Sequence, residues 1–322
     1  MTSVQLAEAS NLAVYATMIT LTLAMVAFAV AFAAGRTTSP ASAATEAVEA
    51  SAVGTTAVLT RTREPGARVG VDPGRRAANI GMSLTWLAFG LLLVAVVLRG
   101  VWAGRVPWGN MYEFSITAAL GVLAVFLLAS IKRDLRWLGL FVVTPTLLWL
   151  GLAVMVLYTE AAQLVPALKS YWLVIHVFAA VISFGAFSLS AATGGLALLR
   201  RRAEGRAAGA PVTGWLAKVP AAEPLEVMTN RVIAFAFPLW TFAVVAGAIW
   251  AEAAWGRYWG WDPKETWAFI TWVVYAAYLH ARSTAGWRQK ATWIALAGYA
   301  TFIINYFGVN IFASGLHSYS GM

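Results

Sequence analysis

Eight stretches of the chain carry no Asp, Glu, Lys or Arg and are long enough, or nearly so, to cross a lipid bilayer. They are residues 9–35, 77–98, 114–131, 137–159, 170–199, 232–251, 266–281 and 291–322. A helix needs about 20 apolar residues to cross the hydrocarbon core. Backbone polar groups in lipid must bond within their own segment or in a closed barrel, and these runs lack the two-residue alternation of barrel strands. The sequence therefore predicts an all-α, polytopic integral membrane protein with about eight transmembrane helices.

Charged residues are scarce along the whole chain. They make up 11% of it, compared with about 25% in soluble domains, while apolar types make up 60%. The run 266–281 is short by itself, and it reaches spanning length only if Glu265 or Arg282 sits at an interface.

The basic residues gather on one side of the predicted bundle. Of the 23 Lys and Arg, 18 fall within residues 36–79, 132–136, 200–231 and 282–290, and five fall in the loops of the opposite side. Short loops rich in Lys and Arg stay in the cytoplasm, so both chain ends and the stretch 252–267 are predicted on the outer side. The net charge of +9 is explained by this topology and gives no reason to expect a nucleic-acid partner.

Three segments follow from these patterns. Residues 1–35 are predicted to be a retained first transmembrane helix, because no Lys or Arg precedes the apolar run as it would in a signal peptide. Residues 36–79, rich in Ala, Thr, Ser and Gly, are predicted to be a flexible cytoplasmic loop. Residues 80–322 form a membrane domain. Within it, 220–231 is expected to be a short helix in the inner interface, and 232–251 is expected to kink near Pro238.

One outer loop, RGVWAGRVPWGNMYEF, leads into the third predicted span. Its Pro, Gly and Asn residues predict a turn, and its aromatic residues belong either to the interfacial belt or to a ligand-facing surface. Glu113 is the most informative residue here, because a carboxylate at the head of a span is costly unless it is paired or close to water. The candidate site residues of this loop are Arg105, Trp108, Asn110 and Glu113.

A second outer loop, WGRYWGWDPKETW, places four of the 16 tryptophans in thirteen positions, Trp255 to Trp267. Asp262, Pro263 and Glu265 fit the N-cap, the first position and the capping box of the next helix. Capping explains the acids, but it does not explain the tryptophans. Their density suggests a planar aromatic ligand.

The chain has three histidines, which the predicted topology places at two depths. His176 begins the fifth span and His317 follows the eighth, so both are expected near the tryptophans on the outer side. His280 lies thirteen residues beyond Trp267, about 20 Å along a helix. Because a metal–nitrogen bond is about 2 Å long, no single metal ion can reach His280 and the outer pair together.

Each histidine taken singly is explained by a hydrogen bond inside the bundle, but the set points to a ligand, since ionisable residues within membranes are rare. Zinc is disfavoured because no cluster of ligands in short spacing exists. The absence of cysteine excludes an iron–sulfur cluster and means that any thiol must come from a partner. Haem needs only one or two axial side chains, an apolar slot and groups to accompany its propionates. Arg257, Lys264 and Arg105 could accompany the propionates.

These residues carry a family resemblance. WGRYWGWDPKETW resembles the tryptophan-rich WWD signature, W-G-x-x-W-x-W-D, of membrane haem-handling proteins, specifically the CcsA/ResC-type cytochrome c biogenesis proteins. The match extends from about Trp102 to His317 and includes PWGNMYEF and SYWLVIHV. It implies that residues 80–322 are a haem-handling domain with the WWD motif at 252–267.

The resemblance also implies site residues. His176 and His317 look like the two outer histidines that ligate haem, here haem b, and His280 looks like the transmembrane histidine of a second, deeper haem position. Residues of the motif would position the outer haem: Trp255, Gly256, Trp259, Trp261 and Asp262. Independently of the resemblance, the residues themselves suggest outer-loop or propionate contacts by Arg257, Lys264, Arg105, Trp108, Asn110 and Glu113.

The implied function is that of a subunit of the System II cytochrome c synthase in a bacterial plasma membrane. With a CcsB/ResB-type membrane partner, it would deliver haem to the outer face and position it for thioether attachment to the CxxCH segment of apocytochrome c. Thiol-reducing proteins would act in the same pathway. Two alternatives are a haem exporter without covalent chemistry, and a scaffold whose aromatic residues only anchor it in the bilayer.

Overall fold

The computed structural model describes residues 2–35, 73–161 and 169–317, and over these ranges the protein is helical and contains no strand. The long helices are α1 (Ser3–Ala34), α3 (Pro73–Ala103), α4 (Met111–Lys132), α5 (Gly139–Val156), α6 (Tyr171–Ala207), α7 (Ala222–Trp255), α8 (Pro263–Ser283) and α9 (Ala291–Ile303). Short helical segments are η1 (Arg136–Leu138), η3 (Trp215–Lys218), the π-helical η4 (Ile304–Gly308) and α10 (Val309–Phe312). The prediction of an all-α membrane protein is confirmed.

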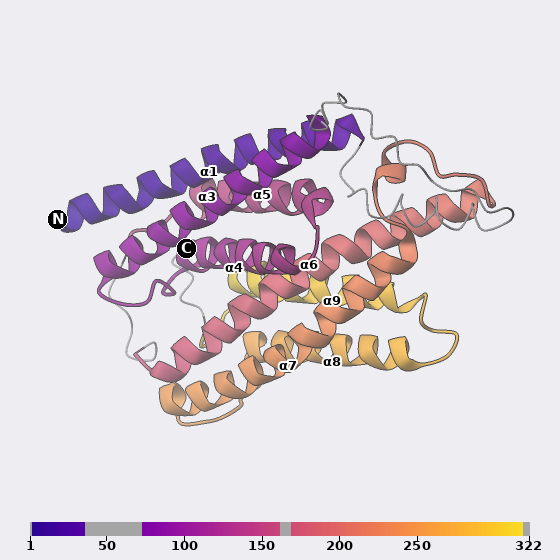
Figure 1. Cartoon of the computed structure of the whole chain (residues 1–322). Coiled ribbons are helices and arrows are strands. Elements are labelled where there is room, and N and C mark those ends of the chain that lie inside the picture. Colours follow the sequence, from indigo (N-terminus) through magenta and orange to yellow (C-terminus); the bar gives the residue numbers. More distant parts are fainter. Residues whose placement is uncertain (1, 36–72, 162–168, 318–322) are drawn as a thin grey trace, which may run out of the picture.

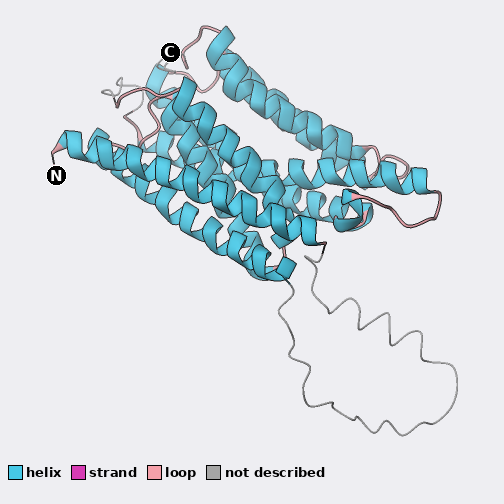
Figure 2. Cartoon of the chain, turned by 90° about the horizontal axis from the view of Figure 1, so that it is seen from above, coloured by secondary structure: helices cyan, strands magenta, loops and turns pink. Residues whose placement is uncertain are grey.

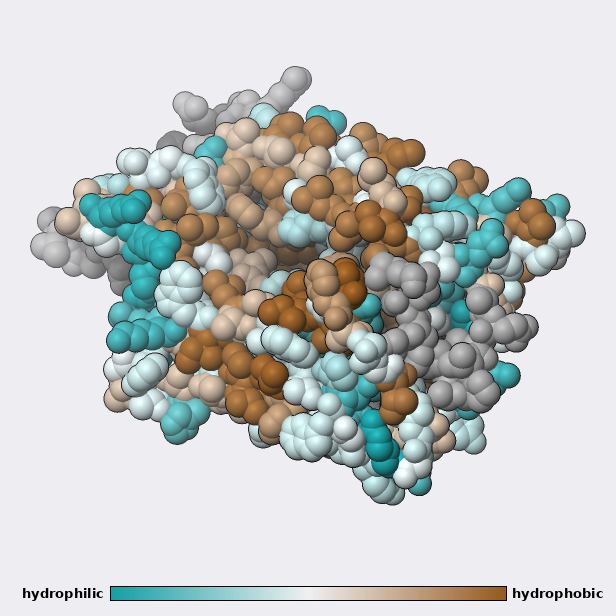
Figure 3. All heavy atoms as spheres, turned by 180° about the vertical axis from the view of Figure 1, so that it is seen from behind, coloured by the Kyte–Doolittle hydropathy of each residue, from teal (hydrophilic) through white to brown (hydrophobic). Residues whose placement is uncertain are grey.

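Seven segments within the described ranges are long and apolar enough to cross a membrane, with α9, η4 and α10 counting as one. The exception is α8, which has charged residues near both of its ends. Its 21 residues nevertheless reach about 30 Å, the thickness of the hydrocarbon core. Figure 3 agrees with this arrangement, because apolar side chains occupy the middle of the face shown and polar ones gather toward the two ends.

Two predicted boundaries are wrong. Helix α3 begins at Pro73, so residues 73–79 belong to a helix and not to the predicted loop 36–79; residues 36–72 lie outside the described part of the chain. The short helix predicted at 220–231 is the first part of α7, which continues through Pro238 to Trp255. A single long helix can carry Glu226 because Arg201 and Arg282 form ion pairs with this buried carboxylate.

The helices form two groups, each with its own core. One core joins α1, α3, α4 and α5 around residues such as Leu21, Leu92 and Leu123, and another joins α6, α7, α8 and α9 around Phe187, Trp240 and Tyr275. Within each group, the long neighbours α1 and α3, and α6 and α7, run side by side (Figure 1). Figure 2 shows the same bundle from above.

The two groups meet most closely where α4 crosses α6. A Cβ added to Gly185 would lie 2.5 Å from the carbonyl oxygen of Gly121, so only glycine at this position permits the two backbones to touch. Small residues of this kind allow membrane helices to approach closely. The contact brings the start of α4 beside α6, where His176 lies.

Contacts between distant segments define the two ends of the bundle. Asn11 in α1 donates to Tyr158 beyond α5 (2.9 Å), and Tyr158 packs against Tyr112 at the start of α4. The C-terminal His317 contacts Asp262 at the start of α8. We call the end that carries residues 104–110, 157–161 and 256–262 the site end. At the opposite end, Lys218 donates to the carbonyl groups of Phe32 and Ala33 (both 2.8 Å).

Candidate functional site

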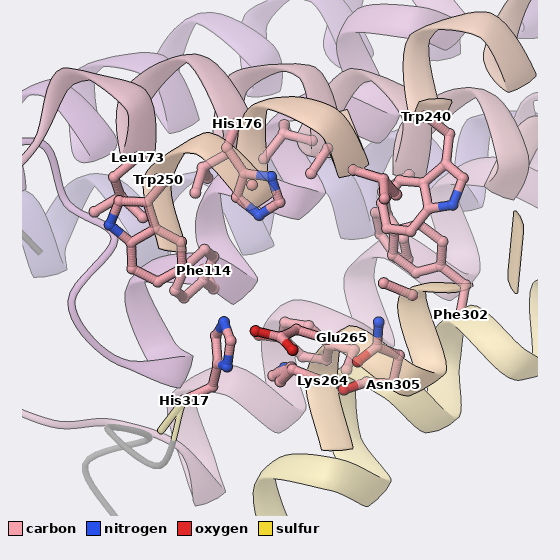
Figure 4. Close-up of a pocket in the computed structure, with 18 of the residues that line it drawn as sticks. Phe114, Leu173, His176, Trp240, Trp250, Lys264, Glu265, Phe302, Asn305 and His317 are labelled. Atoms are coloured by element: carbon pink, nitrogen blue, oxygen red, sulfur yellow. Dashed lines mark hydrogen bonds between the residues drawn. The ribbon is translucent and has the colours of Figure 1, made fainter. Parts of the chain in front are cut away.

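A cavity of about 200 Å³ opens between α4, α6, α7, α8 and the π-helical segment that follows α9. Most of its lining is apolar or aromatic. His176 comes from α6, Trp250 from α7, and His317 from the chain beyond α10. Figure 4 shows His176 and His317 on opposite sides of the hollow, with Trp250 and Trp240 on its flanks.

His176 is held by the backbone of α7. Its Nδ1 lies 2.7 Å from the carbonyl oxygen of Ala243, and a carbonyl can only accept, so Nδ1 carries the proton. In the neutral ring the lone pair is then on Nε2, the atom that binds a metal. The close approach depends on Gly247, because a Cβ there would lie 2.8 Å from the imidazole.

His317 is held by a carboxylate. Its Nδ1 lies 2.8 Å from Oδ1 of Asp262, the N-cap residue of α8. The same carboxylate accepts from the backbone N–H of Leu316 (2.7 Å), and Gly315 makes room, because a Cβ there would lie 2.4 Å from Oδ2. A carboxylate that accepts from a histidine fixes the tautomer and the orientation of the ring for metal binding.

Asp262 is ionised throughout the physiological pH range. Burial by itself raises the pKa of this carboxyl, but the hydrogen bond and charge of His317, with the backbone N–H groups of Lys264 and Leu316, lower the pKa to about 2. The carboxylate is therefore a charged partner of His317 at neutral pH.

Tryptophans of α7 connect the two histidines. Trp250 is nearly parallel to the His176 ring at 6.1 Å and lies edge-on to His317 at 5.4 Å. Trp255 lies 4.8 Å from both Trp250 and His317. The two imidazoles and two indoles form one continuous aromatic wall, of which His176, Trp250 and His317 line the cavity, while Trp255 is not among the described lining residues.

The other predicted motif residues occupy distinct places. Trp259 lines the cavity. Trp261 is 66% exposed and has a positive φ of 57°, and it lies edge-on to Trp259 at 5.9 Å. Gly256 ends α7 in the left-handed conformation, with φ of 70°. These residues therefore do not share a single role in the geometry.

The predicted capping box is confirmed, and it forms part of a larger network. Asp262 and Glu265 cap α8 reciprocally. Glu265 also accepts from Arg257 (2.9 Å) and from the N–H of Gly260 (2.8 Å). The Arg257 guanidinium is thus already paired with a carboxylate.

The loop before α4 contains a second ion-pair network. Glu113 is fully buried and binds Arg105 (2.7 Å) and Arg99 (3.2 Å), which provides the pairing that a carboxylate at this depth requires. Arg105 and Glu113 are not among the described residues that line the cavity, whereas Asn110 is. Trp108 is buried in one cluster with Trp250, so it packs against the aromatic wall and does not line the cavity.

His280 is separate from this cavity. It lies near the other end of α8 with an exposed side chain, and its backbone carbonyl accepts from the hydroxyl groups of Ser283 and Thr284. The structure therefore brings together His176 and His317 but not His280, in agreement with the two depths expected from the sequence.

Several cavity residues were not predicted. Trp250, Trp240, Phe302 and Asn305 line the hollow, yet in the sequence they lie inside apolar runs. The asparagine was the best available signal, because a polar amide in a spanning run is unusual. Its position depends on the π-helix Ile304–Gly308, and π-helical segments occur frequently at functional sites.

The fold and the site together define an all-α, multi-pass membrane protein with a histidine-flanked aromatic cavity at one end of its bundle. Residues 108–317 match the family described as Cytochrome C assembly protein, which covers more than half of the chain. The chain therefore belongs to this family, and its role lies in cytochrome c maturation.

Individual relatives agree with this assignment. The cytochrome c biogenesis protein CcsA of Microcystis aeruginosa is 36% identical over 287 residues, which cover 74% of this chain and 87% of the relative. CcsA of Guillardia theta is 35% identical over 256 residues, covering 74% and 85%. The resemblance to CcsA-type proteins is confirmed.

A solved structure of the cytochrome c haem lyase CcmF is similar in fold, with a TM-score of 0.59 at 18% identity. The match covers 95% of this chain and 47% of the lyase chain. At this identity the likeness concerns the fold alone, and this chain corresponds to less than half of the lyase.

Proposed function

We propose that this protein binds haem in the outer cavity, between His176 and His317, and positions it for attachment to apocytochrome c. The observation that carries the proposal is that imidazoles from two distant segments flank one aromatic cavity (Figure 4), each held through Nδ1 by an oxygen acceptor. Because Nδ1 of each ring is used in this contact, Nε2 is the nitrogen available to bind the haem iron.

The two histidines are not equivalent as ligands. A carboxylate accepts from His317, whereas a neutral carbonyl accepts from His176. The charged acceptor makes His317 the more strongly electron-donating ligand. The position of His176 is instead set by the backbone of α6 and α7.

Bound haem supplies two vinyl groups for attachment. Each cysteine thiol of the CxxCH segment adds across one vinyl double bond: a sulfur–carbon bond forms, the thiol proton ends on the neighbouring carbon, and no oxidant is consumed. The chain contains no cysteine, so its own residues act by binding and orienting. Holding two reactants in place can lower a barrier by about 7–11 kcal/mol at best.

The remaining parts of the proposal extend this role. The site end faces the outside of a bacterial plasma membrane, and a CcsB/ResB-type subunit completes the synthase. His280 contributes to a second haem position deeper in the membrane, with the other ligand from that subunit. Haem b is the form carried, and thiol-reducing proteins prepare the apocytochrome. The exposure of His280 on the bundle surface supports a site shared with a partner.

The test is an absorption spectrum of the purified protein with its partner, compared with His176→Ala and His317→Ala variants. Each variant is expected to lose haem from the outer site and to stop forming holocytochrome c, with imidazole in the medium restoring part of the haem signal. Unchanged haem content and cytochrome yield in both variants would end the assignment. Product analysis separates this role from haem export, since only attachment leaves thioether-linked haem on the cysteine-containing substrate.

A further inference from the structure

One cation of the cavity has no carboxylate partner within the described part of the chain. Lys264 lines the hollow near the start of α8, and its Nζ donates to the backbone carbonyl of Asn305 (3.1 Å). It also lies 5.8 Å above the ring of Tyr306. Among the described residues, no carboxylate oxygen lies within 4.0 Å of this ammonium group.

The two acids nearest to Lys264 in sequence are committed to other donors. Glu265 accepts from Arg257 and from the N–H groups of Gly260 and Asp262. The Asp262 carboxylate accepts from His317 and from the backbone N–H groups of Lys264 and Leu316. The side-chain charge of Lys264 is therefore left facing an apolar cavity, where a charge without a counter-ion is costly.

A second polar group shares this corner. Asn305 is only 9% exposed, and its side-chain Oδ1 is buried without a hydrogen-bond partner among the described residues. A half-turn of the amide exchanges this oxygen for the NH₂ group, which is a donor. Figure 4 shows Lys264 and Asn305 together on the side of the hollow that carries His317.

The other candidate cations of the site end are bound elsewhere. Arg105 is paired with Glu113 at 2.7 Å and Arg257 with Glu265 at 2.9 Å, and neither arginine is among the described residues of the cavity lining. Of Arg105, Arg257 and Lys264, it is Lys264 that lines the cavity.

We propose that Lys264 and Asn305 bind a carboxylate of the cargo, which for haem is a propionate. This inference rests on the proposed function and adds the orientation of the ligand. The propionates share one edge of the porphyrin, so holding them at the corner between α8 and the π-helix directs that edge to Lys264. The vinyl groups belong to the two other pyrroles of the same rigid ring, so their position relative to the thiols of the CxxCH segment is fixed as well.

The test compares two probes on the purified full-length chain in nanodiscs: ferric protoporphyrin IX and its dimethyl ester, in which both carboxylates are neutral. Wild type is expected to bind the diacid about tenfold to a hundredfold more tightly, as a hydrogen-bonded ion pair predicts. The ratio of the two affinities should approach one in Lys264→Met and remain high in Lys264→Arg. Both affinities are measured by absorption titration.

Arg257→Met is the matched control, since it removes a neighbouring cation that already has a carboxylate partner. It should leave the ratio unchanged even if both affinities fall. Equal affinity of wild type for the two probes, or a wild-type ratio in Lys264→Met, would overturn the carboxylate site while leaving haem binding intact. Failure of wild type to bind either probe would overturn the proposed function as well.

Discussion

Two loops at the site end are built on the same plan. In each, an arginine precedes a glutamate by eight residues, an N-cap residue lies between them, and a glycine N–H donates to the glutamate. In the loop before α4 these residues are Arg105, Gly109, Asn110 and Glu113, and in the loop before α8 they are Arg257, Gly260, Asp262 and Glu265. In both loops a Cβ on the glycine would collide with the arginine guanidinium.

The loops differ in what they do with this shared plan. Glu113 is fully buried and binds a second arginine, Arg99, whereas the pair in the other loop includes Arg257, whose side chain is 30% exposed. The cap before α4 is a neutral asparagine, but the cap before α8 is a carboxylate that holds His317. The comparison teaches that Glu113 joins two arginines inside the fold, whereas the carboxylate of Asp262 positions a histidine at the cavity.

The largest predicted effect is a difference in stability between variants of the two glutamates. Glu113→Gln removes the counter-charge of two arginines inside the protein, and breaking a buried ion pair costs about 3–5 kcal/mol. Glu265→Gln removes the partner of one partly exposed arginine, and the cost should be about 1 kcal/mol. Thermal unfolding in detergent without haem measures both. Equal losses of stability would show that the two networks do not differ in this way.

The next prediction exchanges the two caps. Asp262→Asn retains a good N-cap but removes the charge that supports His317, so haem affinity should fall about tenfold to a hundredfold. Asn110→Asp also retains a cap and should leave haem affinity close to wild type. Haem titration followed by absorption measures both variants. Comparable losses of affinity would mean that the charge on Asp262 is not what distinguishes the loops.

The smallest effect concerns the glycines. A Cβ on Gly109 would lie 2.6 Å from the Arg105 guanidinium, whose side chain is 11% exposed, so Gly109→Ala should cost about 1–3 kcal/mol. Gly260→Ala creates a closer clash, at 2.0 Å, but Arg257 can move toward solvent and the cost should be less than about 1 kcal/mol. Chemical denaturation of each variant gives the values, and the reverse order would mean that Arg257 is the more rigidly held residue.

Sequence reasoning succeeded where the signal was local. The number and type of helices followed from charge-free runs, and the cap of α8 followed from Asp262, Pro263 and Glu265. The separation of His280 from the outer histidines followed from helix length alone. In each case the relevant interaction lies within one segment or depends only on distance along it.

The remainder depended on contacts between distant segments. Nothing local to Arg105 shows that its carboxylate partner is buried, or that Lys264 is the cation left facing the cavity. Asn305 reaches the cavity through a π-helical turn, and Trp250 lines the cavity only because α6 and α7 pack together. Two boundaries were also misplaced: α3 begins at Pro73, before the charge-free run, and α7 continues through the segment predicted as a separate interfacial helix, where Arg201 and Arg282 pair with the buried Glu226.

The attachment of His317 has a consequence for how a bound metal could change partners. His176 belongs to a helix of 37 residues, so withdrawing it would require a transmembrane element to shift. His317 instead follows the last helical turn, where its Nδ1 is held by the carboxylate of Asp262 and its ring lies edge-on to Trp250 and Trp255. If haem binds here as proposed, releasing His317 requires the loss of contacts with one carboxylate and two indoles, whereas releasing His176 requires the movement of a whole transmembrane helix.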